Sequence, residues 1–218
     1  MITILQHGEH EPAGTIEETL FGGENTVSVL RLYEGDPVPV DPPKKLIILG
    51  GQMSVNDEHE FPFLRDEKAL VKNAVAHGSV VLGICLGAQM IAAACGKNVY
   101  TGEMEMGWRT ISGCHSPGSR FFPGNFEVFH WHKETFDLPE GARLLATGNA
   151  VKIQAFMLNN AVGVQFHPEV TKEIITFWAK DLCAEEQAAL LKASEGKLGE
   201  NRILCDALVH AFVSGWRW

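Results

Sequence analysis

The chain has 218 residues, of which 45% are hydrophobic and 21% are charged, and its formal net charge is −9 at pH 7. This length fits one domain with a substantial core, and the ordinary composition excludes a disordered chain. The acidic balance disfavours nucleic acid and anionic membranes as partners, no apolar run reaches the roughly 18 residues of a membrane span, and the N-terminus lacks the pattern of a signal peptide.

Strand-like apolar runs alternate with helix-like segments in the first part of the chain, which is typical of α/β architecture. Residues 2–6 and 27–32 are predicted strands, and the proline-rich segment 35–43 is a predicted loop. Residues 46–49 form an apolar run that ends in a glycine pair, as in a parallel strand buried on both faces. Residues 63–77 have apolar side chains near helical spacing and predict a helix.

The second part of the chain continues the alternation. Residues 79–96 begin as a β-branched strand and continue as an alanine-rich helix closed by glycine. Residues 97–165 predict short strands and turns, with a further strand over residues 162–166. Residues 172–192 and 201–213 predict helices. Together these elements favour an open α/β sheet flanked by helices.

One cysteine stands apart from the others. The five cysteines contain no CxxC pair, which indicates free thiols in a reducing cytoplasm. Cys85, however, lies in a G-x-C-x-G segment between a strand and a helix, the form of a nucleophile elbow with Cys in place of Ser. The sharp turn exposes the thiol at the helix N-terminus, where unpaired N–H groups stabilise a thiolate, and it places the Leu86 N–H to bind an oxyanion.

A base for this thiol is expected from the segment His167-Pro168-Glu169, which follows a predicted strand. The proline favours extended backbone, in which residues i and i+2 point to the same side. Glu169 is therefore placed to orient the His167 imidazole, so that Cys85, His167 and Glu169 form a predicted catalytic triad.

The glycine pair at residues 50–51 also follows a predicted strand, and ligands of open α/β sheets bind beyond the carboxyl ends of strands. Glycine permits close backbone approach to a ligand, so Gly51 N–H is the candidate second oxyanion donor beside Leu86 N–H.

Other polar residues keep two interpretations each. Gln89 lies one turn after the cysteine and either holds substrate or makes a capping or loop contact. His130 and His132 share one side of a strand, but the sequence offers no clear third ligand, so we expect a structural or substrate-pocket role and no metal. We include His132 among the substrate-binding residues.

The motifs GGQMS, GICLGAQ and FHPE, in this order, resemble the class I glutamine amidotransferase (triad glutaminase) family over roughly residues 45–170. The segment HWHKETFDLP and the pair GW at residues 107–108 are similar to its stand-alone, GMP-synthase-like branch, which includes γ-glutamyl peptidases. That branch typically has Gly-Asp where this chain has Lys133-Glu134. The resemblance implies an open, mostly parallel, flavodoxin-like sheet flanked by helices, in a single domain over residues 1–218.

It also implies the chemistry. Cys85 attacks the γ-carbonyl of glutamine and forms a γ-glutamyl thioester. His167 moves the proton, and Glu169 orients His167. The backbone amides of Gly51 and Leu86 bind the oxyanion that forms during the reaction. Gln89 helps to hold the amino-acid part of the substrate. No metal or organic cofactor is expected.

Three functions remain open at this point. No P-loop or GxGxxG motif is present, so an amidotransferase of this sequence would pass ammonia to a separate synthetase. Alternatively, the chain acts alone as a γ-glutamyl peptidase, or it is a non-catalytic binding module. The intact Cys85, His167 and Glu169 argue against the last of these.

Overall fold

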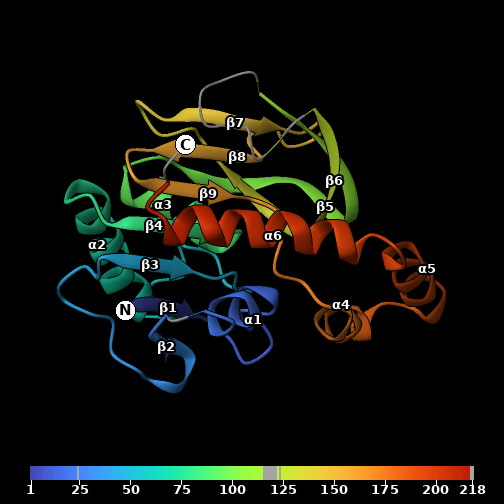
Figure 1. Ribbon diagram of the computed structural model, residues 1–218, viewed down its shortest axis with the longest axis horizontal. Coiled ribbons are helices and arrows are strands. Elements are labelled where there is room, and N and C mark those ends of the chain that lie inside the picture. Colours follow the sequence, from blue (N-terminus) through green and yellow to red (C-terminus); the bar gives the residue numbers. More distant parts are fainter. Residues whose placement is uncertain (24, 115–121, 123, 217–218) are drawn as a thin grey trace.

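A computed structural model describes residues 1–216 apart from residues 24, 115–121 and 123. Its centre is one mixed sheet of nine strands in the order β2-β1-β3-β4-β9-β8-β7-β5-β6 (Figure 1). The strands are β1 (Ile2–Gln6), β2 (Val27–Arg31), β3 (Lys45–Ile48), β4 (Val80–Ile84), β5 (Val99–Gly113), β6 (Asn125–Phe136), β7 (Arg143–Thr147), β8 (Ala155–Leu158) and β9 (Ala161–Val164).

The sheet has a parallel half and an antiparallel half. Strands β2, β1, β3, β4 and β9 pair in parallel, with Ile4 opposite Ile47 and Gly83 opposite Gly163. From β9 onward every pairing is antiparallel, through β8, β7, β5 and β6. The expected open sheet flanked by helices is thus confirmed, and the parallel strands agree with the predicted ones to within two residues at each end.

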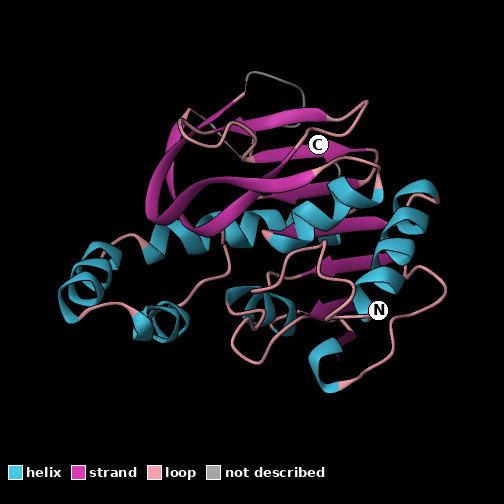
Figure 2. Ribbon diagram, turned by 180° about the vertical axis from the view of Figure 1, so that it is seen from behind, coloured by secondary structure: helices cyan, strands magenta, loops and turns pink. Residues whose placement is uncertain are grey.

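Helices cover both faces of the parallel half. The helices are α1 (Thr15–Phe21), α2 (Phe63–Ala76), α3 (Leu86–Ala94), α4 (Lys172–Trp178), α5 (Ala184–Ser194) and α6 (Leu198–Val213). One core cluster joins the sheet to α1 and α6, while a second joins it to α2 and α3. Helix α6 crosses in front of the strands in Figure 1. Figure 2 shows the molecule from the opposite side, and there α2 and α3 lie nearer to the viewer than the sheet.

Two predictions about the elements are corrected. The region expected to hold short strands does contain the short strands β7, β8 and β9, but it also contains a long antiparallel pair, β5 and β6, of 15 and 12 residues. The helix predicted over residues 172–192 is divided into α4, a 3-10 turn (Ala179–Asp181) and α5, because the chain is extended at Leu182. The sequence analysis also missed α1, whose start at a glycine gives no side-chain capping signal.

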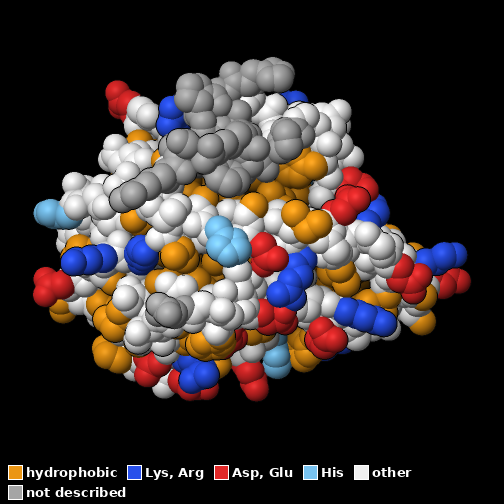
Figure 3. All heavy atoms as spheres, in the orientation of Figure 1, with side chains coloured by type: hydrophobic (Ala, Val, Ile, Leu, Met, Phe, Trp, Pro, Cys, Tyr) orange, Lys and Arg blue, Asp and Glu red, His pale blue; other side chains and the backbone are white. Residues whose placement is uncertain are grey.

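The surface in Figure 3 carries acidic and basic side chains close together over the C-terminal helices. Ion pairs join Lys197 to Glu127 and Arg202 to Glu18 across elements. None of the helices in the described residues is long and apolar enough to cross a membrane.

Candidate active site

The predicted site residues meet at the carboxyl edge of the parallel half. Neighbouring strands β3, β4 and β9 are each followed by one part of the site: the pair Gly50-Gly51, then Cys85, then the segment from Gln165 to Glu169. Because the carboxyl ends of parallel strands lie at one edge, groups far apart in sequence become neighbours there.

Cys85 occupies the turn between β4 and α3 in a strained backbone conformation. Its φ of 50° and ψ of −102° are uncommon for a residue with a side chain. The flanking glycines are required by packing, since a Cβ on Gly83 would lie 2.5 Å from the Gly87 carbonyl carbon and one on Gly87 would lie 2.2 Å from the Ile48 oxygen. Strand and helix thus pack closely enough to hold the Cys85 side chain at the apex of the turn, as a nucleophile elbow requires.

His167 and Glu169 lie side by side as the sequence predicted. The Nδ1 atom of His167 lies 2.7 Å from Oε1 of Glu169, and both side chains are buried. The His167 backbone N–H donates to the Phe129 carbonyl at 2.8 Å, and the Trp178 ring packs edge-on against the imidazole with 4.8 Å between centroids. Within the described residues the Nε2 atom of His167 has no hydrogen-bond partner, which leaves it for chemistry beside Cys85.

The pKa of His167 supports an ion pair between its imidazole and the Glu169 carboxylate. Burial alone lowers the pKa, but the charges of Glu169 and then Cys85, together with the hydrogen bond to Glu169, raise it to about 10. The imidazole therefore carries a proton at neutral pH, beside the buried Cys85 side chain.

The segment after His167 is held by groups from two helices. Thr15 N–H at the start of α1 donates to the Glu169 carbonyl at 3.0 Å, and Asn201 on α6 donates its amide to the Pro168 carbonyl at 2.9 Å. These contacts fix the backbone that carries both His167 and Glu169.

Gln165 is a site residue that the sequence analysis missed. Its Nε2 lies 3.6 Å from the Cys85 sulfur and donates to it, while its Oε1 accepts from Gln89 Nε2 at 3.4 Å. The signal was available in the predicted strand over residues 162–166, because Gln165 stands two residues before His167 and residues i and i+2 of an extended chain point to the same side.

Gln89 is buried at the cavity and contacts protein groups through its amide nitrogen. Nε2 donates to the Glu134 carbonyl at 3.2 Å as well as to Gln165. Nε2 thus contacts one group in strand β6 and one in the segment after β9. In the part of the chain that the structure describes, Gln89 Oε1 has no hydrogen-bond partner.

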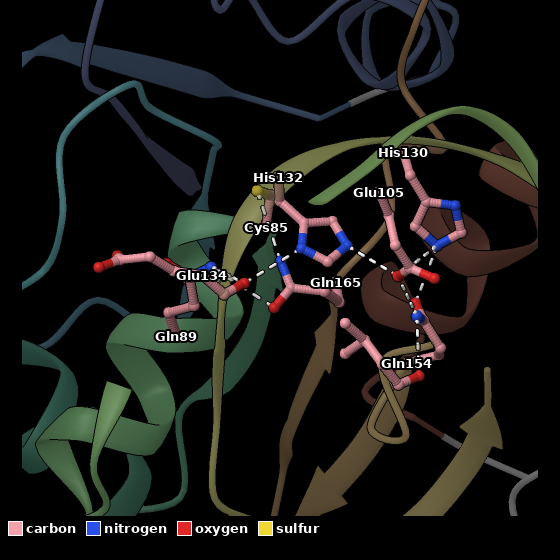
Figure 4. Close-up of polar contacts among 9 residues, drawn as sticks. Cys85, Gln89, Glu105, His130, His132, Glu134, Gln154 and Gln165 are labelled. Atoms are coloured by element: carbon pink, nitrogen blue, oxygen red, sulfur yellow. Dashed lines mark hydrogen bonds and ion pairs between the residues drawn. The ribbon is translucent and has the colours of Figure 1, made fainter. Parts of the chain in front are cut away.

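A buried polar network continues from this point into the antiparallel half (Figure 4). His132 contacts the Glu134 carbonyl through Nδ1 and Glu105 through Nε2, both at 3.1 Å. Glu105 also accepts from Gln154 at 2.7 Å, and the Gln154 Oε1 lies 2.9 Å from His130 Nε2. Burial raises the pKa of Glu105, but hydrogen bonds and charges from its neighbours outweigh this and lower it.

The same network supplies the third potential ligand that the sequence did not show. Glu105, His130 and His132 each offer an atom within 4.8 Å of the others. Glu105 faces His132 directly across the β5–β6 pair, and it lies far away in the sequence. The hydrogen bonds of these side chains with each other and with Gln154 account for the cluster as a structural network.

A cavity of about 770 Å³ opens beside Cys85 and His167. Its lining includes Gly51, Cys85, Gln89, His132 and His167, so the predicted catalytic and substrate-binding residues face one space. Further lining groups of both charges are Glu11, Asp57, Lys133, Glu134, Lys180 and Asp181. Leu86 is the first residue of α3, where the backbone N–H has no partner inside the helix.

Comparisons with known proteins agree with this geometry. Residues 23–175 match the family model described as Glutamine amidotransferase class-I. The glutamine amidotransferase-like protein YfeJ of Salmonella typhimurium is 32% identical over 185 residues, covering 80% of this chain and 77% of YfeJ. A GMP synthase [glutamine-hydrolyzing] of Yarrowia lipolytica is 34% identical over 157 residues, which cover 66% of this chain but only 28% of that protein.

Among solved structures, a glutamine amidotransferase from Thermotoga maritima is similar to the chain with a TM-score of 0.88 and 30% sequence identity. The superposition covers 97% of each chain. The similarity therefore includes both halves of the sheet and the C-terminal helices.

Proposed function

Because the chain belongs to the class I glutamine amidotransferase family, we propose that it hydrolyses the γ-amide of glutamine through a γ-glutamyl thioester on Cys85. Hydrolysis of the glutamine amide is the activity that this family implies. The observation that carries the proposed mechanism is the buried His167–Glu169 pair at 2.7 Å, with the free Nε2 of His167 beside the strained Cys85 turn.

In the acylation step, the Cys85 thiolate attacks the γ-carbonyl carbon and a C–S bond forms. The carbonyl oxygen becomes an oxyanion, which the N–H groups of Leu86 and Gly51 bind. His167 then gives the Nε2 proton to the amide nitrogen, the C–N bond breaks, and ammonia leaves. Glu169 keeps Nδ1 engaged, so that the proton is transferred from Nε2.

In the deacylation step, His167 accepts a proton from water through Nε2 and the resulting hydroxide attacks the thioester carbonyl. The same two N–H groups bind the second oxyanion, the C–S bond breaks, and glutamate leaves with the thiolate restored. Each step is a proton transfer or an acyl transfer by groups of this chain, and we propose that no metal or organic cofactor takes part.

The cavity suits a substrate with both an ammonium and a carboxylate group. Carboxylates of Glu11, Asp57, Glu134 and Asp181 line it together with the amino groups of Lys133 and Lys180. We propose that Gln89 Oε1 accepts from the substrate ammonium and that His132 shapes the opposite wall. An α-amino acid such as glutamine has both charges, and so does a γ-glutamyl compound.

We propose that a separate synthetase consumes the ammonia. Glutamine-hydrolysing GMP synthase is a much longer relative, of which the matched part is a minor share. Such a partner would bind near the open cavity, and the chain would act there as one domain.

The test measures glutamate and ammonia release from glutamine by the isolated protein, with Cys85→Ala as the variant and His77→Gln, a change of an exposed histidine, as the control. We expect release by the wild type and the control, and none above background by Cys85→Ala. Release that persists in Cys85→Ala would overturn the mechanism. Cleavage of γ-glutamyl peptides without cleavage of glutamine would instead assign the chain to γ-glutamyl peptidase activity.

A further inference from the structure

Another buried histidine, His7, lies next to the site and has no part in the proposed chemistry. His7 follows β1, the strand beside β3, and it is 1% exposed. Its Nδ1 lies 3.1 Å from the Gly50 carbonyl oxygen, and its Nε2 lies 3.0 Å from the carboxylate of Glu67 on α2. Glu67 is 0% exposed, so this is a fully enclosed pair.

Both ring nitrogens of His7 face oxygen atoms that can only accept. A histidine that satisfies two such partners donates from both nitrogens and carries a proton on each. Burial lowers the pKa of His7, but the Glu67 charge, hydrogen bonds to Glu67 and Gly50, and the more distant Glu11 charge outweigh burial and raise it. The Gly50 carbonyl thus accepts a charge-assisted hydrogen bond, which is stronger than a neutral one.

This bond fixes the direction of one peptide group. The C=O of Gly50 and the N–H of Gly51 belong to the same peptide plane, and the described residues contain no cis peptide bond. In a trans peptide the N–H points opposite to the C=O. Since the Gly50 oxygen points toward His7 beside β1, the Gly51 N–H points to the other side of β3, where Cys85 follows β4.

We propose that His7, held by Glu67, is a positioning residue that fixes the Gly50–Gly51 peptide with the Gly51 N–H directed at the oxyanion of the reaction at Cys85. The inference rests on the acyl-transfer function proposed above. In the described chain the Gly51 N–H has no hydrogen-bond partner of its own, and Gly51 lines the cavity.

The packing around the two glycines explains why a hydrogen bond is needed there. A Cβ on Gly50 would lie 3.0 Å from Cε1 of His167, and one on Gly51 would lie 2.6 Å from Leu86 Cδ2 and 3.0 Å from His7 Cβ. A side chain at either position would push against these neighbours, and glycine leaves the backbone free to rotate. Without a side chain to restrict it, this peptide depends on the bond from His7 to keep one orientation.

A matched pair of variants separates the two contacts of His7. In His7→Asn, the amide nitrogen is two bonds from Cβ, as Nδ1 is, so it can donate to the Gly50 carbonyl. In His7→Gln, the amide nitrogen is three bonds from Cβ, as Nε2 is, so it reaches Glu67 instead. Both variants lose the imidazolium and keep a neutral amide, and His7→Asn also leaves the buried Glu67 carboxylate without its partner, so we expect His7→Asn to lose more folding stability than His7→Gln.

The kinetic measurements are kcat and KM for glutamine, together with the rate at which iodoacetamide alkylates Cys85. Loss of one oxyanion donor lowers kcat by about 10²- to 10³-fold. We expect that loss in His7→Gln with KM changed by less than about threefold, and His7→Asn within about tenfold of the wild-type kcat. Alkylation forms no oxyanion, so its rate should stay at the wild-type value in both variants.

Equal losses of kcat in the two variants, or an alkylation rate that falls with kcat, would overturn the proposal in favour of a general structural role. Crystal structures of both variants provide a readout that is independent of turnover. The proposal requires a rotated Gly50–Gly51 peptide in His7→Gln and the wild-type orientation in His7→Asn. If the wild type hydrolyses no glutamine or γ-glutamyl compound, the proposed function fails, while the two peptide orientations still decide the role of His7.

Discussion

The two halves of the sheet differ in where they place their polar side chains. In the parallel half, the proposed reactive groups stand just beyond the strands, as Cys85 does after β4 and His167 after β9. In the antiparallel half, buried polar groups such as Glu105 and His132 lie within the strands and bond to one another. The edge of a sheet leaves a side chain free to meet a substrate, while the face of a sheet suits a network that supports one wall of a cavity.

The largest expected effects come from residues at the carboxyl ends of the parallel strands. His167→Ala removes the proton donor, and we expect kcat for glutamine to fall about 10⁶-fold; Glu169→Ala leaves the base unoriented and lowers kcat by roughly 10⁴-fold. Steady-state ammonia release measures both, with His77→Gln as the control. A loss of less than tenfold in either variant would remove that residue from the triad.

A second experiment compares the reactivity of a cysteine at the carboxyl ends of the parallel strands with that of a cysteine in the core. Cys205 on α6 is 0% exposed, and burial raises its pKa to about 12, whereas Cys85 borders the cavity beside a protonated His167. At pH 8 we expect iodoacetamide to modify Cys85 and to leave Cys205 unmodified, because only about 10⁻⁴ of the Cys205 thiol is ionised. The exposed Cys183 is the reference for an ordinary thiol. Mass spectrometry of the peptides measures all three, and modification of Cys205 at the rate of Cys183 would contradict the account.

In the antiparallel half, the prediction concerns stability rather than chemistry. Burial, the largest cause, lowers the pKa of His130 from 6.5 to about 4. The unfolded chain therefore takes up this proton at a higher pH than the folded chain, so the free energy of unfolding falls as the pH drops from 6.5 to about 4. The shift corresponds to about 3 kcal/mol. Urea unfolding of the wild type and His130→Gln across this range measures it, and identical pH profiles of the two proteins would exclude His130 as the cause.

The smallest expected effect links the two halves. Glu105→Gln keeps an acceptor for His132 but removes the negative charge of the network. We expect the cavity wall to bind glutamine less firmly, with KM raised by about tenfold and kcat changed by less than threefold. Full steady-state kinetics separate the two constants. A fall in kcat with unchanged KM would mean that the antiparallel half takes part in the chemistry itself.

The same contrast explains what the sequence could predict. The parallel strands, the elbow at Cys85 and the pairing of His167 with Glu169 follow from rules about neighbouring residues, such as buried apolar runs and the period of two in extended chain. The sequence analysis missed Gln165 and His7, although similar rules apply to both: Gln165 stands two residues before His167, and His7 directly follows a parallel strand.

The network of the antiparallel half could not be predicted in this way. Glu105 meets His132 only because β5 and β6 pair in a register that shifts between Thr101 and Glu105. Such an irregularity changes which side chains face inward, and no residue next to Glu105 in the sequence indicates it. Gln154, which lies just before β8, donates a hydrogen bond to Glu105 in β5 from a distant part of the sequence.

The central claim is that a covalent γ-glutamyl group forms on Cys85. Its most direct test is acid quenching of the wild-type protein during turnover of glutamine, followed by mass spectrometry of the proteolysed chain. The account predicts a γ-glutamyl adduct on the peptide that contains Cys85 and its absence from the Cys85→Ala variant. An adduct on another residue, or steady glutamate release in the variant, would contradict it.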